Sequence, residues 1–188
     1  LGSIQWLTAG TAISIVGTSL NVSGTATSAA EGIVELATAA ETTTGTDAGR
    51  VITPDGLAGS DYGKRVVGIL IDDSTTLETT GSARVHFRVP SIMNNWNLTG
   101  VAISNFTAGT TTATQVMIRN KTDAANMLST SLFIDSAETD SSTSATAAVI
   151  NAATDDVATG DIIAVDVNAV HSGSAAAGLF VEMIYQAL

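Results

Sequence analysis

The chain has 188 residues, enough for one domain of ordinary size with several dozen residues to spare. Its 18 acidic and 7 basic side chains give a formal net charge of −11 at pH 7, so a polyanion such as DNA or RNA would be repelled. The absence of cysteine excludes disulfides, thiolate nucleophiles and cysteine-ligated metals. No apolar stretch approaches the roughly 20 residues of a membrane span. We therefore predict no nucleic-acid binding and no membrane insertion.

The composition changes near residue 61. Residues 1–60 are rich in Gly, Ala and Thr, contain Arg50 as their only basic residue, and have apolar runs too sparse to enclose a core. Such a segment cannot offset its own ordering entropy as an isolated monomer. We predict a short extended N-terminal stem, or attachment segment, over residues 1–60 and a separate domain over residues 61–188.

Two strands and a helix are predicted in the stem. Residues 12–16 and 19–23 both alternate between apolar and polar side chains, which predicts a small β-hairpin or meander. A lone two-stranded hairpin is marginal in water, so segments from other chains would help to stabilise it. Residues 31–37 fit either a short strand or a helical turn. A brief helix is predicted to begin at Pro54, because Thr53 suits the N-cap and Pro suits the first helical position.

Strand-like runs recur from residue 61 to the C-terminus, with turn residues between them. Several alternate: Val85 and Phe87 share one face of their strand, and His86 lies on the other. This pattern indicates an antiparallel sheet with one buried face. We predict an all-β fold, a jelly-roll-like antiparallel β-sandwich. Its eight expected strands cover residues 66–72, 83–89, 98–106, 114–120, 128–135, 147–151, 161–168 and 178–185.

Two segments carry a resemblance to a known class of protein. The first resembles a module common in fibre proteins of tailed bacteriophages, through AEGIVELAT at residues 30–38, AE at 40–41, GTD at 45–47 and, after Arg50, VITPDGL at 51–57. The second, residues 85–181, is similar to a β-rich C-terminal domain of phage structural proteins, through FRVP at 87–90, IRN at 118–120, MLST at 127–130 and IDSAETDSS at 134–142.

The resemblance implies a component of the virion, assembled in the host cytoplasm: a tail fibre, a head fibre or a capsid decoration. Such appendages are usually homotrimers. Their N-terminal part holds them to other virion proteins of the capsid, tail or baseplate, and their C-terminal domain faces outward toward the host surface. The resemblance does not imply an enzyme. The alternative function is a receptor-recognition module that binds or cleaves a host glycan.

The sequence offers no catalytic or metal-binding constellation. Only His86 and His171 have an unperturbed pKa near neutrality; we expect His86 to be solvated or in contact with another subunit, and His171 to be a plain loop residue. The acidic clusters at Asp135 to Asp140 and Asp155 to Asp161, and the Asp72-Asp73 pair, lack the spacing of an EF-hand and are interpreted as turn residues. We predict no catalytic residue, no cofactor and no metal.

Partner contact is predicted in the loops of the sandwich. The scarce aromatic Trp96 lies in a polar stretch with Asn94, Asn95 and Asn97, where an indole could stack on a sugar ring or anchor a partner, or could instead plug one end of the sandwich. The loops at residues 91–97, 108–112 and 135–146 would form the surface that faces away from the stem.

Overall fold

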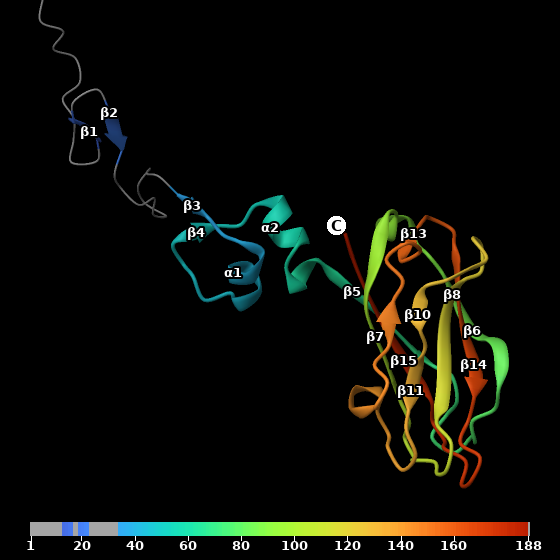
Figure 1. Cartoon of the computed structure of the whole chain (residues 1–188). Helices are drawn as coiled ribbons and strands as arrows, with labels where there is room; N and C mark the ends of the chain where they lie inside the picture. The colour runs from blue at the N-terminus through green and yellow to red at the C-terminus, as the bar shows by residue number, and fades with distance from the viewer. Residues whose placement is uncertain (1–12, 17–18, 23–33, 188) are drawn as a thin grey trace, which may run out of the picture. The chain divides into compact units, whose positions relative to one another are not determined.

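The computed structural model describes residues 13–16, 19–22 and 34–187 (Figure 1). The chain divides into two compact units, Leu1–Tyr62 and Gly63–Leu188, close to the change in composition at residue 61. Each unit has its own sheets. None of the helices in the described part is long and apolar enough to cross a membrane.

The first unit contains the expected hairpin. Strands β1 (Ile13–Val16) and β2 (Ser19–Val22) are antiparallel, with Ile13 opposite Val22 and Val16 opposite Ser19. This confirms the hairpin over those residues; its predicted outer ends, residues 12 and 23, lie outside the described residues.

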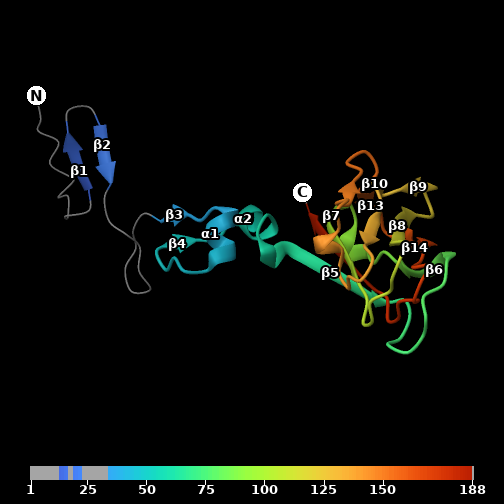
Figure 2. The same cartoon turned by 60° about the horizontal axis from the view of Figure 1, so that its bottom comes forward.

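A small α/β segment, residues 34–62, follows and is called the module below. It consists of β3 (Glu35–Leu36), α1 (Ala39–Thr44), β4 (Arg50–Val51), α2 (Pro54–Ala58) and the start of the 3-10 helix η1 (Asp61–Gly63) (Figure 2). Strands β3 and β4 pair in parallel, so the open choice for residues 31–37 is settled as a strand over its described part. Helix α2 is capped as predicted: the Thr53 hydroxyl accepts a hydrogen bond from the Gly56 N–H at 3.0 Å. Helix α1 was not predicted.

The second unit is an antiparallel sandwich of two sheets. The β5 sheet has the order β13-β7-β15-β5, and the β6 sheet has the order β11-β8-β14-β6, with β9 beside β8. A further small sheet pairs β10 with β12. The bounds are β5 Lys64–Leu70, β6 Gly81–Arg88, β7 Trp96–Ser104, β8 Thr114–Asn120, β9 Ala125–Asn126, β10 Leu128–Thr130, β11 Leu132–Ile134, β12 Val149–Ile150, β13 Asp156–Val157, β14 Ile162–Ala169 and β15 Phe180–Ala187; short 3-10 helices are η2 Ser91–Met93 and η3 Ser141–Thr143.

The pairing of the strands gives a jelly roll. Strand β5 pairs with β15, β6 with β14, β7 with β13 and β8 with β11, as in one long antiparallel hairpin rolled up into two sheets. The predicted all-β sandwich is thus confirmed, and all eight expected strands have counterparts. One expectation was wrong in detail: residues 128–135 form two short strands in different sheets, because the register breaks between β10 and β11. Strands β9 and β13, of two residues each, were not predicted.

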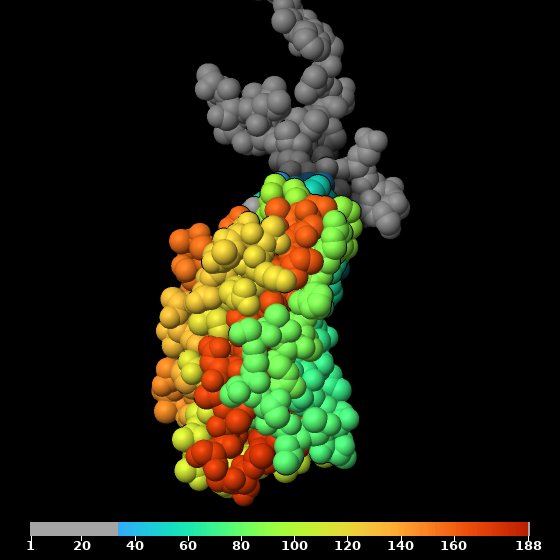
Figure 3. Space-filling model, turned by 90° about the vertical axis from the view of Figure 1, so that its right-hand side faces the viewer, coloured from blue at the N-terminus to red at the C-terminus, as the bar shows by residue number. Residues whose placement is uncertain are grey.

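Alternate residues of the two sheets build the core. On β6, Val85 and Phe87 pack against it as expected, and the Phe87 ring meets Tyr185 edge to face with centroids 6.0 Å apart. Figure 3 shows strands distant in sequence, β6 and β14, side by side on the surface. The fully buried side chains come from both sheets and include Leu98, Ile103, Ile118, Leu132, Ile134, Ile163, Leu179 and Met183.

Candidate functional site

The module is organised by a capping box at the start of α1. The Thr38 N–H donates to the Glu41 carboxylate at 3.0 Å, and the Glu41 N–H donates to the Thr38 hydroxyl at 3.3 Å. The two side chains thereby satisfy backbone donors that the first helical turn leaves free. Gly45 ends the helix at a φ of +66°, where its N–H donates to the Glu41 carbonyl at 2.9 Å. The sequence therefore fixes both ends of α1.

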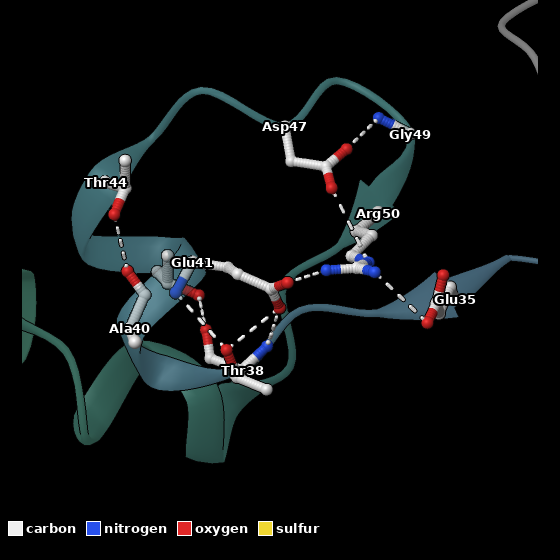
Figure 4. A network of polar contacts seen from close by, with 9 residues as sticks. Glu35, Thr38, Ala40, Glu41, Thr44, Asp47, Gly49 and Arg50 are labelled. Carbon is white, nitrogen blue, oxygen red and sulfur yellow. Dashed lines mark hydrogen bonds and ion pairs between the residues drawn. The ribbon is translucent and has the colours of Figure 1, made fainter.

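Arg50 joins the two strands and the helix of the module through three acidic side chains (Figure 4). Its guanidinium lies 3.2 Å from the Glu35 carboxylate and 3.5 Å from that of Asp47, and it also contacts Glu41. Exposed ion pairs of this kind stabilise by at most about 1 kcal/mol each. Here the ion pairs fix β3, β4 and α1 relative to one another, because Arg50 lies on β4, Glu35 on β3 and Glu41 on α1.

Close backbone packing holds α2 against the rest of the module. A Cβ at Gly56 would lie 3.1 Å from the carbonyl oxygen of Ala37, and one at Gly59 would lie 3.3 Å from the Cβ of Ala39. These two positions therefore favour glycine for lack of space. The module is therefore a small folded unit and not an extended linker.

Burial in the module is inverted relative to a globular domain. Its buried residues include the polar Thr42 and Ser60 together with Gly56, whereas its large apolar side chains are exposed. Leu36 is 62% exposed and lies directly opposite Val51, which is 46% exposed, in the β3–β4 pair. We call the exposed set the module apolar surface; its members are Val34, Leu36, Val51, Ile52, Leu57 and Tyr62. Within this set, the β3–β4 pairing places Leu36 and Val51 side by side.

Trp96 does not lie in a loop, contrary to the expectation. It is the first residue of β7, opposite Ala187 of β15 and Val157 of β13. The side chain is half-buried against the core, and the Arg65 guanidinium lies over its ring at 5.7 Å. Trp96 therefore closes one end of the sandwich while leaving part of its ring accessible.

The three asparagines near Trp96 support neighbouring turns. The Asn94 side-chain oxygen accepts from the Thr159 N–H at 2.9 Å, and the Asn97 amide donates to the Asp155 carboxylate at 3.0 Å. Asn95 takes a positive φ of 59° before β7. Two of these amides are thus occupied within the domain, and partner contact through Asn94, Asn95, Trp96 and Asn97 stays a prediction.

The loops expected to form one outward surface lie at opposite ends of the sandwich. Lys64 and Asn97 both face Gln186 across the sheet, so β5 and β7 begin at the same end, where residues 91–97 lie. Residues 108–112 follow β7 and residues 135–146 follow β11, which places both at the other end. The expectation of one continuous surface was wrong, because residues 91–97 precede β7, whereas the other two loops lie at the opposite end of the sandwich.

His171 is buried, so the expectation of a plain loop residue was wrong. Its side chain and that of Glu78 are fully inaccessible, with Nδ1 of His171 4.0 Å from the Glu78 carboxylate. Thr114 lies between them: its hydroxyl donates to Glu78 and lies 2.9 Å from His171 Nδ1. Burial raises the pKa of Glu78, an effect that the Thr114 hydrogen bond and the nearby His171 oppose. Sequence spacing could not reveal this group, since its members come from three separate segments.

Several members of the acidic clusters hold turns, as interpreted from the sequence, but Asp72 does not: it is buried, and its carboxylate lies 2.6 Å from the Arg84 guanidinium. The Asp73 carboxylate accepts from the N–H groups of Thr75 and Thr76, and these hydrogen bonds lower its pKa to about 2. Asp140 accepts from the Ser142 N–H at 2.6 Å, which lowers the Asp140 pKa. In the described part of the chain, no group of three His, Cys, Asp or Glu side chains is arranged to hold a metal ion.

An ion pair on the outer face of the β6 sheet was not foreseen. Arg119 on β8 contacts Asp166 on β14 through two nitrogens, at 2.8 and 3.0 Å. Asp166 also accepts from the N–H of Ala83, and its pKa is lowered chiefly by Arg119. The register between β8 and β14 brings the two residues together, and the sequence alone does not show this register.

In comparisons with known proteins, no family model, no curated protein and no solved structure matches the chain.

Proposed function

We propose that this chain is a non-enzymatic structural protein of a bacteriophage virion, a homotrimeric fibre or appendage whose N-terminal part attaches it to other virion proteins. The observation that carries the proposal is the module apolar surface. Six large apolar side chains are exposed on a segment of fewer than thirty residues. Association of copies removes that surface from water and offsets the ordering entropy that one chain alone cannot.

The resemblance of residues 30–57 to a phage fibre module supports the virion role. In the structure its characteristic residues have definite tasks: Thr38 and Glu41 cap α1, Arg50 joins the strands, and Thr53 caps α2. These tasks are structural. They suit a module that positions an assembly surface.

The buried Glu78–Thr114–His171 group supports the absence of catalysis. An acid, a base and a hydroxyl within hydrogen-bond reach form the arrangement that nucleophilic catalysis requires. Here the side chains of Glu78 and His171 have no accessible surface, and Thr114 has none either. A substrate cannot approach them, so the group acts on stability.

The mass of the full chain in solution tests the assembly. We expect light scattering at micromolar concentration to give about three times the chain mass of 19.0 kDa. Leu36→Asp, which places a charge on the module apolar surface, should lower the mass toward that of one chain. Thr46→Asp is the matched control, since it adds the same charge at an exposed loop position of the module. A wild-type monomer whose module resists protease would contradict the proposal.

The position of the protein on a particle tests the virion role. An antibody against the sandwich should label purified phage particles at one fixed site, seen by electron microscopy. Label found only in the lysate of infected cells, or reducing sugar released from host glycans by the purified chain, would contradict it.

A further inference from the structure

The outer face of the β5 sheet is apolar. On strand β5, Val67 and Ile69 pack against the core, so Val66, Gly68 and Leu70 point to the opposite face. Val66 is 60% exposed and Leu70 is 56% exposed. The edge strand β5 therefore exposes two large apolar side chains, Val66 and Leu70, on the outer face of its sheet.

The neighbouring strands extend this face in cross-strand rows. Leu70 lies opposite Phe180 of β15, and Val66 lies opposite Ile184. Between these two rows, Glu182 lies opposite Gly68 on one side and Ala102 on the other. Glu182 thus carries the only charge in the three rows, and we call them together the β5-sheet face.

Two glycines in the middle of strands let neighbouring side chains lie flat on this face. A Cβ at Gly68 would lie 2.6 Å from the Phe180 ring, and one at Gly100 would lie 3.2 Å from Ile184. Both apolar side chains therefore lie down over a glycine of the adjacent strand. The space that these glycines leave is thus filled from within the sheet, which makes the face flat.

Three hollows that share lining residues lie along the β5-sheet face and beyond its β7 side. One is lined by Leu70, Phe106 and Phe180, and the next shares Phe180 and also includes Ala102. The third, of about 500 Å³, shares Ala102 and extends to Val149. Phe106 and Val149 are 75% and 49% exposed. Polar side chains, among them Asp73, Asp140 and Ser141, line the hollows together with these exposed apolar ones. Exposed apolar side chains grouped along a surface are typical of an interaction site.

The connection of the chain indicates what covers the β5-sheet face. Strand β5 begins at Lys64, two residues after Tyr62, so at most about 7 Å of chain separates the two units. Where modules of several copies associate, each β5 must then begin close to its counterparts. Among the described strands β5 pairs with β15 alone, so it is an edge of its sheet.

A second copy has to overcome charge repulsion. The chain has a net charge of −11, so most of its surface repels another copy. The three rows of the β5-sheet face carry one carboxylate, Glu182, and Asp140 and Asp73 line the hollows beside them. Tethering through the modules raises the local concentration of neighbouring domains, so even a small apolar contact suffices.

We propose that the β5-sheet face is covered by the jelly-roll domain of a second copy of this chain, an inference that rests on the proposed assembly through the module. The jelly roll is then part of the trimer contact, and its β6 sheet, with Arg84, His86 and Arg88, faces outward.

Because the chain contains no cysteine, single cysteines report directly on this face. Leu70→Cys and Val66→Cys place a thiol on the β5-sheet face, and His86→Cys places one at an exposed position on the β6 sheet. The full-length variants are reacted with a maleimide probe at micromolar concentration, after their mass and melting temperature have been compared with the wild type. In the assembled protein we expect Leu70→Cys and Val66→Cys to react at least tenfold more slowly than His86→Cys, and all three to react alike in denaturant.

The outcomes separate the two proposals. If the chain is oligomeric and the three cysteines react equally fast, the face is free in the assembly and the inference is overturned, while association through the module stands. Slow reaction of His86→Cys alone would place the contact on the β6 sheet, and this result would also overturn the inference about the β5-sheet face. A wild-type monomer overturns both the assembly and the covered face.

Discussion

The buried Glu78–Thr114–His171 group shows at the scale of single residues why position in the sequence is a poor guide to environment. His171 stands in a stretch of Gly, Ser and Ala that reads as an exposed loop. Its ring instead packs so closely on Gly109 that a Cβ there would lie 2.3 Å from it. Burial of this histidine depends on loops that are far apart in the chain, and no local pattern encodes it.

Glu78 makes stability depend on pH in a definite direction. Its folded-state pKa is raised by burial, so the folded protein holds this proton more tightly than the unfolded chain. The stability that protonated Glu78 contributes is complete below pH about 4.5, its ordinary pKa, and is lost as the pH rises through the raised value. Glutamine cannot ionise. As the pH rises above about 4.5, we therefore expect the free energy of unfolding of Glu78→Gln to increase relative to that of the wild type.

Urea unfolding at a series of pH values measures the difference. Glu138→Gln is the control for the substitution itself, because Glu138 lies near the surface, where its carboxylate accepts a hydrogen bond from the Thr143 hydroxyl at 2.7 Å. A constant difference for Glu78→Gln would show that burial of this carboxyl is not linked to protonation.

At the scale of elements, the strands with clear alternation were predictable, and the shortest elements were not. Residues 83–89 and 161–168 alternate because one face of each is buried, and both appear as β6 and β14. Strand β13 has only two residues, too few for a period to show, and exists because Val157 pairs with Trp96. Thr53 and Pro54 predict the start of α2, and Thr38 with Glu41 three residues later is an equivalent signal for the start of α1.

Helix α1 depends on its capping box. Thr38→Ala removes the hydroxyl that accepts from the Glu41 N–H, a loss that costs about 1 kcal/mol in typical helices. We expect faster hydrogen exchange over residues 39–44 in the full chain, by about fivefold for that energy. Thr44→Ala is the control: its hydroxyl bonds the Ala40 carbonyl within the same helix and caps nothing. Equal exchange in the two variants would count against a role for the cap.

At the scale of the whole molecule, the change in composition near residue 61 lies close to the boundary between the two units, Leu1–Tyr62 and Gly63–Leu188. An acidic, cysteine-free chain with few aromatic residues and many Thr, Val and Ala side chains is well suited to pleated sheets, and the second unit is a jelly roll. The inverted burial of the module could not be seen in composition, because it depends on which side chains face inward. That burial pattern, together with the apolar β5-sheet face, is the basis for proposing an assembly of copies.

Salt should strengthen that assembly. Copies with a net charge of −11 repel one another, whereas the contacts proposed between them are apolar and bring few charges together. The screening length falls from about 30 Å at 0.01 M salt to about 8 Å at 0.15 M, so added salt weakens the repulsion and leaves the apolar contact intact. We expect the dissociation midpoint, followed by light scattering on dilution, to move to several-fold lower protein concentration over this range. Dissociation on adding salt would instead mean that ion pairs, such as those of exposed acids with Arg65 or Arg88, hold the copies together, and it would contradict the apolar interface.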